Sequence, residues 1–175
     1  TGKSLIARAY ERARKLTEAD SIYIATAQKY KDQVQKLVPE VPENHLFLEP
    51  MRRDTTAAFV HVCARLEAEG RGDEPTIFLW ADHLFTNEKE FIADLKRIPD
   101  ILASNPDTLV LVGHTPLNPN TALGYFKAGQ PITPHEDVFE VKEFIEKPER
   151  SRAEEFVADG TYYWMSGSRS GVSRE

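Results

Sequence analysis

Short apolar runs that alternate with helix-patterned segments are the feature that most restricts the fold of this chain. The runs are SIYIAT at 21–26, HLFLEP at 45–50, TIFLWAD at 76–82 and TLVLVG at 108–113. Segments with helical patterning lie between them, at 28–37, 55–69 and 88–102. Strands that alternate with helices of about ten to fifteen residues indicate βαβ units around a parallel sheet. The sequence therefore predicts an α/β fold, a three-layer α/β/α, Rossmann-like sandwich whose sheet is mostly parallel.

The pattern changes after Gly113. A loop rich in proline and asparagine, TPLNPNTALGY, precedes a longer alternating strand at 138–148, a helix at 152–158 and an aromatic strand at 162–164. We expect one partial domain over residues 1–167, incomplete at both ends, and an atypical polar tail over 168–175. Basic residues on the first helix are interpreted as its solvated face; they are Arg8, Arg12, Arg14 and Lys15.

Charge and cysteine content restrict the possible partners. The formal net charge of −6 over 175 residues, with both signs interspersed, argues against nucleic acid as a partner. No apolar run approaches the roughly 20 residues that cross a bilayer, so no membrane association is expected. Cys63 is the single cysteine, and its apolar helical surroundings favour a buried structural thiol in a reducing, cytoplasmic setting. The sequence does not indicate an oligomeric state.

The opening TGKS resembles the end of a phosphate-binding loop, in which a lysine and a hydroxyl residue hold a nucleotide and its Mg²⁺. The glycines that would complete such a loop would precede Gly2.

Polar residues that follow buried strands are the first candidates for a site, because ligands of doubly wound sheets bind at the carboxyl ends of the strands. Asp82 ends an apolar run and can present its carboxylate to a hard cation such as Mg²⁺. Its alternative role is to cap the following helix, but that helix is expected to begin only at 88. For His83 a hydrogen-bonded structural role is favoured over ligation.

Three other strand ends carry polar residues. The segment after Glu49 and Pro50 leads into a helix and offers cationic side chains, hydroxyls and free N–H groups to a base or phosphate; it contains Arg52, Arg53, Asp54 and Thr55. Asp54 could equally be a plain N-cap.

Gly124 would allow close approach of a ligand, or it would merely serve a turn. Glu146 and Lys147 offer an acceptor for sugar hydroxyls and a charge for a phosphate, or they form a solvated ion pair.

Taken in order, these segments resemble the sugar-phosphate nucleotidyltransferases, and most closely the mannose-1-phosphate guanylyltransferases. The matching motifs are LEPMRRDTTAA at 48–58, FLWADH at 78–83, PNTALGYF at 119–126 and FIEKPE at 144–149. The resemblance implies a glycosyltransferase-A-like nucleotidyltransferase sheet. It also implies transfer of a nucleotidyl group from GTP to mannose-1-phosphate, which gives GDP-mannose and pyrophosphate with Mg²⁺ as cofactor.

The resemblance also implies roles for individual residues. The set around the nucleobase is Glu49, Pro50, Arg53, Asp54 and Thr55. Asp82 would bind Mg²⁺, and the sugar phosphate would be held by Gly124, Glu146 and Lys147. Asp82 and Lys147 would carry catalysis by neutralising charge, because in-line attack on the α-phosphorus needs no side-chain nucleophile.

The chain departs from the family pattern at several positions. The family's glycine-rich loop would precede Thr1, so we expect this chain to be a fragment that is poorly active or inactive on its own. Asp54 stands where an asparagine is usual, Ala57 replaces a proline and Ala122 replaces a glycine. In YYWMSG at 162–167, Met165 stands where the family has an asparagine that contacts the sugar.

Three alternatives stay open from sequence. A uridylyl- or thymidylyltransferase that uses glucose-1-phosphate would share the fold. A non-catalytic homologue that binds a nucleotide sugar would account for Met165 and the polar tail. A phosphate-loop NTPase would explain TGKS, but it would leave the EKP and LGY segments without a role. The resemblance implies instead that Gly2 and Ser4 are turn and cap residues at the start of the first helix, and that Lys3 is not a phosphate ligand.

Overall fold

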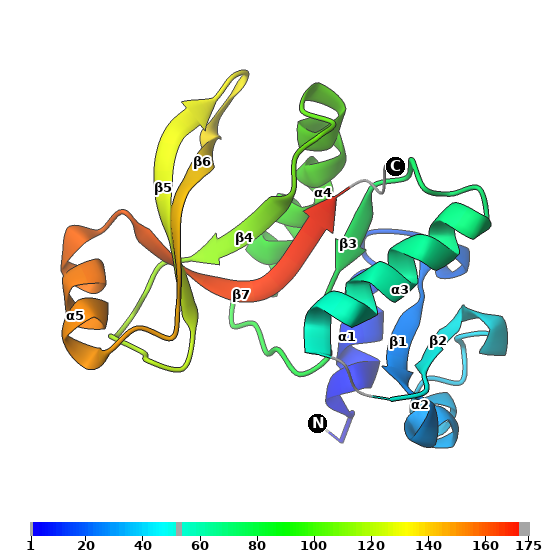
Figure 1. Cartoon of the computed structure of the whole chain (residues 1–175). Helices are drawn as coiled ribbons and strands as arrows, with labels where there is room; N and C mark the ends of the chain where they lie inside the picture. Colours follow the sequence, from blue (N-terminus) through cyan, green and yellow to red (C-terminus); the bar gives the residue numbers. More distant parts are fainter. Residues whose placement is uncertain (1, 52–53, 172–175) are drawn as a thin grey trace. The chain divides into compact units, whose positions relative to one another are not determined.

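The computed structural model describes residues 2–51 and 54–171 (Figure 1). The chain divides into two compact units, of which unit 1 lies mainly within Thr1–Thr108 and unit 2 is Leu109–Arg169. The helices of unit 1 are α1 (Leu5–Ala13), α2 (Lys31–Leu37), α3 (Asp54–Ala68) and α4 (Glu88–Ser104). Its strands are β1 (Ile24–Ala27), β2 (Leu46–Glu49) and β3 (Thr76–Phe78). Unit 2 contains β4 (Val110–His114), β5 (Gly124–Ile132), β6 (His135–Glu146), α5 (Arg150–Asp159) and most of β7 (Tyr162–Gly171).

In unit 1 the strands β1 and β2 pair in parallel, with Ile24 opposite Leu46. Because side chains alternate along a strand, β2 has two different faces. Leu46 belongs to a cluster with Val34 of α2, against which residues of α1 pack, whereas Phe47 belongs to a cluster with Val62 of α3. Helices therefore cover both faces of the β1–β2 sheet, as the predicted α/β/α layering requires.

The helix predicted for 88–102 is confirmed as α4. Asn87 is its N-cap, and its side-chain oxygen accepts a hydrogen bond of 3.4 Å from the Glu90 backbone N–H. The apolar stripe of the helix is buried and consists of Phe91, Ile92, Leu95, Ile98, Ile101 and Leu102.

In unit 2 the strand β5 pairs antiparallel with β6 on one side and with β7 on the other. Strand β4 also pairs with β7. One face of this sheet packs against α5, through a cluster formed by Tyr125, Ala153, Phe156 and Tyr162. Gly124 and Phe126, which alternate with Tyr125 along β5, belong to the opposite face.

The strand predicted for 76–82 is shorter than expected, because β3 ends at Phe78 and Asp82 lies in a turn. Two aromatic residues of the run, Phe78 within β3 and Trp80 beyond it, both contact Phe59 of α3. The ring of Trp80 lies over Phe59 of α3 with centroids 5.9 Å apart. Apolar content therefore suggested a longer strand than the backbone forms.

The observed bounds of β1 and β7 differ less from the predicted ones. A short 3₁₀ turn occupies Ala19–Ser21, so β1 begins later than the predicted 21–26 run. Strand β7 continues to Gly171, beyond the aromatic residues that predicted it. No helix in the part of the chain that the structure describes is both long and apolar enough to span a bilayer.

Cys63 of α3 is half-buried, and burial raises the pKa of its thiol. A raised pKa leaves the thiol protonated and unreactive, which agrees with the structural role expected for it.

Candidate functional site

The three residues predicted to hold a sugar phosphate lie together in unit 2. In the β5–β6 ladder Gly124 is directly opposite Glu146, and Lys147 follows immediately. In the β5–β7 ladder Gly124 is also opposite Met165. Residues that face each other across a ladder have their side chains on the same side of the sheet. Glu146 and Met165 therefore flank Gly124 on the face that α5 does not cover.

Gly124 has a steric role at this position. A Cβ on Gly124 would lie 2.7 Å from Oε2 of Glu146 and 3.0 Å from Cζ of Phe144. Both distances are too short for an unperturbed contact. Gly124 is the first residue of β5, and the missing side chain gives the Glu146 carboxylate its place above the strand. The turn role that the loop composition suggested is not the reason for glycine here.

Lys147 has a special backbone conformation. Its φ of 47° places a non-glycine residue in the left-handed region, and its backbone N–H donates a hydrogen bond of 3.3 Å to the carbonyl oxygen of Leu123. Its Nζ lies 3.4 Å from Oε1 of Glu146, while 64% and 51% of the two side chains are exposed. The solvated ion pair considered from sequence is therefore present. Its exposure leaves both groups accessible to a ligand.

Phe144 belongs to the same site, although sequence reasoning assigned it no role. It lies two residues before Glu146 on β6, faces Phe126 across the ladder and is substantially exposed. An exposed aromatic ring next to a carboxylate offers an apolar surface to the C–H groups of a sugar. The sequence FIEKP contained a signal for this placement, because residues two apart on a strand share a face and Phe144 therefore lies on the same face as Glu146.

Asp82 in unit 1 is well exposed, in a turn beyond β3. Its side chain is 82% exposed, and Oδ1 lies 3.9 Å from Nε2 of His83. Burial lowers the pKa of His83; Asp82 acts in the opposite direction, and Arg12 lowers the pKa further. Because Asn87 caps α4, Asp82 does not have the capping role that was its alternative.

The surroundings of Asp82 fit a sparsely coordinated cation. Among the residues that the structure describes, no three or more His, Cys, Asp or Glu side chains form a metal-binding group. Mg²⁺ keeps several waters and is often bound by one or two carboxylates together with substrate phosphates. An exposed single carboxylate matches that mode of binding, and it does not match an all-protein cage.

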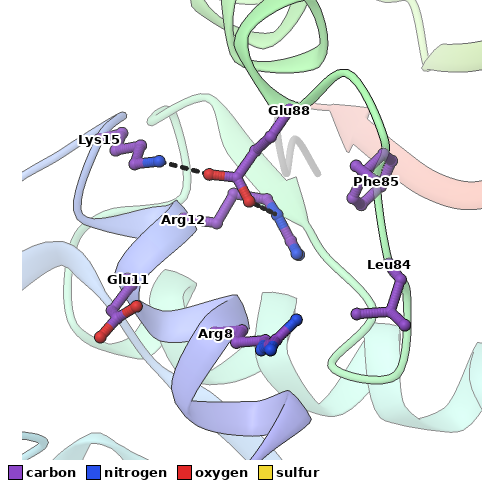
Figure 2. A pocket seen from close by; sticks show the side chains of 7 residues that line it. All are labelled: Arg8, Glu11, Arg12, Lys15, Leu84, Phe85 and Glu88. Atoms are coloured by element: carbon purple, nitrogen blue, oxygen red, sulfur yellow. Dashed lines mark hydrogen bonds and ion pairs between the residues drawn. The ribbon is translucent and has the colours of Figure 1, made fainter. Parts of the chain in front are cut away.

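Arg12 of α1 is buried, contrary to the prediction. The basic stretch was interpreted as a solvated face, but the Arg12 side chain is only 2% exposed. Its Nη2 donates a hydrogen bond of 3.2 Å to the backbone carbonyl of His83, and its Nε lies 3.4 Å from Oε2 of Glu88. Its guanidinium lies 4.6 Å from the ring centroid of Phe85. The side chains of Arg12, Phe85 and Glu88 line a hollow of about 230 Å³ (Figure 2).

A signal for this burial was present in the sequence. Arg12 follows Leu5 by seven residues and Ala9 by three, so it lies on the apolar stripe of α1. The neighbouring Arg14 lies off that stripe, is exposed and pairs with Glu18. The position of each arginine around the helix, and not its charge, therefore predicts that Arg12 is buried and Arg14 is exposed.

The residues predicted around the nucleobase lie at the connection from β2 to α3. Glu49 is the half-buried last residue of β2, and Pro50 is exposed. Asp54 is the first residue of α3, and Thr55 follows it with an exposed side chain. Arg53 lies outside the described residues.

The opening TGKS starts a helix. Ser4 is the N-cap of α1, and its Oγ accepts a hydrogen bond of 3.3 Å from the Ala7 backbone N–H. Lys3 forms an ion pair with Glu11, and Gly2 has a φ of 67°, which favours glycine. These contacts agree with the turn-and-cap interpretation and give Lys3 a partner within the protein.

Comparison with known sequences gives a consistent result. The profile of the nucleotidyl transferase family matches residues 1–170. The chain is 38% identical over 122 residues to the alginate biosynthesis protein AlgA of Pseudomonas aeruginosa, which covers 70% of this chain and 25% of that protein. It is 38% identical over 126 residues to a mannose-1-phosphate guanylyltransferase of Klebsiella pneumoniae, covering 71% and 26%. The chain thus spans about a quarter of the length of these curated relatives.

Solved structures agree on the fold. A crystal structure described as mannose-1-phosphate geranyltransferase from Thermus thermophilus superposes with a TM-score of 0.84 and 26% identity, over 98% of this chain and 48% of that one. A mannose-6-phosphate isomerase from Helicobacter pylori gives a TM-score of 0.79 at 24% identity, over 98% and 62%. The predicted nucleotidyltransferase-type α/β fold is confirmed, and the chain belongs to the nucleotidyl transferase family.

Proposed function

We propose that a full-length protein containing this chain transfers a nucleotidyl group from GTP to mannose-1-phosphate, forming GDP-mannose and pyrophosphate. The observation that carries the proposal is that Gly124 and Glu146 lie opposite each other in the β5–β6 ladder, with Nζ of Lys147 3.4 Å from the Glu146 carboxylate. Family membership supports the reaction class, and relatives that are described as mannose-1-phosphate guanylyltransferases support the choice of substrates.

The sugar phosphate would bind in unit 2. The Lys147 ammonium group supplies a positive charge for the phosphate, and the Glu146 carboxylate accepts hydrogen bonds from sugar hydroxyls. Gly124 leaves the space that the Glu146 carboxylate occupies beside the Phe144 ring. Phe144 provides an apolar surface beside the carboxylate, so the sugar would meet a charge and an aromatic ring on the same sheet face.

The nucleotide would bind in unit 1. The base would be surrounded by Glu49, Pro50, Asp54 and Thr55, which lie between the end of β2 and the start of α3, together with Arg53. The N-terminus of α3 there offers backbone N–H groups. Asp82 would hold Mg²⁺, which supplies charge neutralisation at the phosphates when it is bound.

The transfer itself requires positioning more than covalent chemistry. An oxygen of the sugar phosphate attacks the α-phosphorus of GTP, the new P–O bond forms, and the bond to pyrophosphate breaks. Lys147 would orient the attacking phosphate and neutralise part of its charge. Holding two reactants in attack geometry and stabilising charge account for catalysis of this kind without a side-chain nucleophile.

A substrate panel tests the proposal. Pyrophosphate release by the full-length protein is measured with GTP, UTP, dTTP and ATP, each combined with mannose-1-phosphate or glucose-1-phosphate. We expect GTP with mannose-1-phosphate to give the highest kcat/KM. Fastest turnover of UTP or dTTP with glucose-1-phosphate would contradict the assignment. Calorimetric binding of GDP-mannose without turnover of any pair would instead identify a non-catalytic sensor, the alternative that Met165 motivates.

A further inference from the structure

We propose that Arg12 is a positioning residue that fixes the segment carrying Asp82 in the geometry needed for the metal. This inference rests on the proposed function, in which Asp82 binds Mg²⁺. Arg12 does not itself contact metal or substrate; it acts through the backbone next to Asp82.

The contacts of Arg12 converge on one short segment of chain. Its hydrogen bond to the backbone carbonyl of His83 fixes the residue directly after Asp82. Its guanidinium lies over the ring of Phe85, two residues further on. The guanidinium therefore holds the segment at two points, by a donated hydrogen bond and by a cation–π contact. A planar group with several N–H donors suits such a combined contact.

The segment depends on side chains to keep its shape. Residues 79–87 form neither helix nor strand, so backbone ladders do not hold them. Beyond Arg12, the ring of Phe85 stacks on Phe91 of α4 with centroids 3.9 Å apart, and Asn87 caps α4. These contacts fix the end of the segment that lies farther from Asp82. The hydrogen bond from Arg12 acts closer to it, on the backbone of the very next residue.

The charge of Arg12 is compensated locally. Glu88, the first residue of α4, lies 3.4 Å from its Nε and also pairs with Lys15, as Figure 2 shows. Hydrogen bonding from Lys15 and, to a smaller extent, the charge of Arg12 lower the pKa of Glu88, which keeps the carboxylate ionised. A buried guanidinium is costly without such a partner. Its retention on an otherwise apolar stripe is explained if it holds the segment while Asp82 stays exposed.

The test uses the full-length protein with Arg12→Met, Arg12→Lys and, as matched control, Arg14→Met. Arg14 lies at the end of the same helix but is exposed, and it bonds to Thr17 and Glu18. The first readout is the Mg²⁺ concentration for half-maximal pyrophosphate release, and the second is Mn²⁺ affinity by electron paramagnetic resonance. The third is hydrogen exchange of residues 79–87 in metal-free protein.

We expect Arg12→Met to raise the half-saturating Mg²⁺ concentration and the Mn²⁺ dissociation constant by about tenfold or more, the range found for residues that orient metal ligands. Exchange in residues 79–87 should become faster. Arg12→Lys should give an intermediate effect, because it keeps the charge but not the planar fork. Arg14→Met should leave all three measurements unchanged.

Separate outcomes distinguish this inference from the proposed function. If Asp82→Asn leaves the Mg²⁺ requirement unchanged, the proposed metal role of Asp82 fails. If Asp82→Asn raises it while folded Arg12 variants do not, only the positioning role is overturned. If Arg12→Met loses its native circular dichroism, it is misfolded and cannot test the positioning role. Arg12→Lys and Phe85→Leu are then used to test it. A normal Mg²⁺ requirement in both of these variants overturns the inference.

Discussion

Two groups of candidate residues in this molecule are built in different ways. In unit 2, strand register places Glu146 and Met165 on either side of Gly124, so the group is assembled by the sheet itself. In unit 1, Asp82 lies on a turn beyond β3, and the next residue is anchored by a side chain from a helix far away in the sequence. A site made by register depends on backbone ladders, whereas a site on an irregular segment depends on individual side chains.

The difference has a physical consequence for substitutions. Ladder hydrogen bonds in unit 2 involve backbone atoms, so changing one side chain there alters the chemistry of the face and leaves the paired backbones in place. In unit 1 a side chain such as Arg12 forms the scaffold, so its loss moves other residues as well. Substitutions in the two regions should therefore differ in kind as well as in size.

The largest effect is expected for Asp82→Asn. Removing the carboxylate charge at the proposed metal position should lower kcat/KM of the full-length protein by about 100-fold, because metal-assisted charge stabilisation contributes several kcal/mol. Steady-state pyrophosphate release at fixed Mg²⁺ measures it. Asp73→Asn, at another exposed turn of unit 1, is the matched control. Equal activity of the two variants would show that Asp82 is not part of the metal site.

Gly124→Ala should have the next largest effect. The added methyl group would meet Oε2 of Glu146 at 2.7 Å, so the carboxylate must move away. Loss of its hydrogen bonds to the sugar should raise the KM for mannose-1-phosphate about tenfold. Gly129→Ala on the same strand is the control, since its new Cβ would contact Glu140 and Lys142. An unchanged KM in Gly124→Ala would show that the register-built group does not hold the sugar.

Met165→Asn in unit 2 is expected to improve sugar-phosphate binding, whereas the two preceding substitutions are expected to impair function. A thioether is a weak acceptor and no donor, whereas an amide can both donate and accept. With a hydroxyl of the sugar opposite it, the substitution should tighten mannose-1-phosphate binding about fivefold, the worth of one added hydrogen bond. Calorimetry on the full-length protein measures this affinity. Weaker binding by Met165→Asn would mean that the position does not face a hydroxyl.

The smallest effect concerns the pH dependence of unit 1. Burial lowers the pKa of His83 from its ordinary 6.5, with Asp82 opposing this change and Arg12 reinforcing it. Below 6.5 the unfolded chain therefore binds the proton more strongly than the folded chain does. The free energy of unfolding should be highest above the ordinary pKa and decrease as the pH falls from there through the lowered pKa of the folded state.

Urea denaturation of wild type and His83→Gln at about pH 7.5 and 5.5, on either side of the ordinary histidine pKa, measures this effect. The wild type should lose more free energy of unfolding than the variant over this interval, because glutamine does not titrate. An equal loss in both proteins would show that burial of His83 has no influence on stability at acidic pH.

Much of the fold could be predicted because its signals are local. Helix α4 was visible as helical patterning over 88–102. The strand at β2 was equally clear, because a short apolar run ends there at Glu49 and Pro50. Local propensity and the tertiary structure agree in these elements, so the sequence alone was sufficient to predict them.

The features that were missed depend on contacts between distant residues. β3 ends at Phe78 although the apolar run continues to Trp80, whose ring packs on Phe59 of α3, so apolar content alone does not mark the end of the strand. The burial of Arg12 requires a partner, Glu88, that lies far along the chain. The role of Gly124 depends on Glu146 opposite it. Sequence therefore nominated Gly124, Glu146 and Lys147 as site candidates and missed Phe144, whereas the β5–β6 ladder explains why Gly124 and Glu146 meet.

The central claim is that the group formed by Gly124, Glu146 and Lys147 binds the sugar phosphate and does not bind the nucleotide. Calorimetry of mannose-1-phosphate and of GTP with full-length wild type, Lys147→Ala and the exposed control Lys142→Ala tests it most directly. We expect Lys147→Ala to weaken mannose-1-phosphate binding at least about tenfold, since a charged hydrogen-bond partner is lost, while GTP affinity and the control stay unchanged. Unchanged mannose-1-phosphate affinity, or an equal loss for both ligands, would contradict the claim.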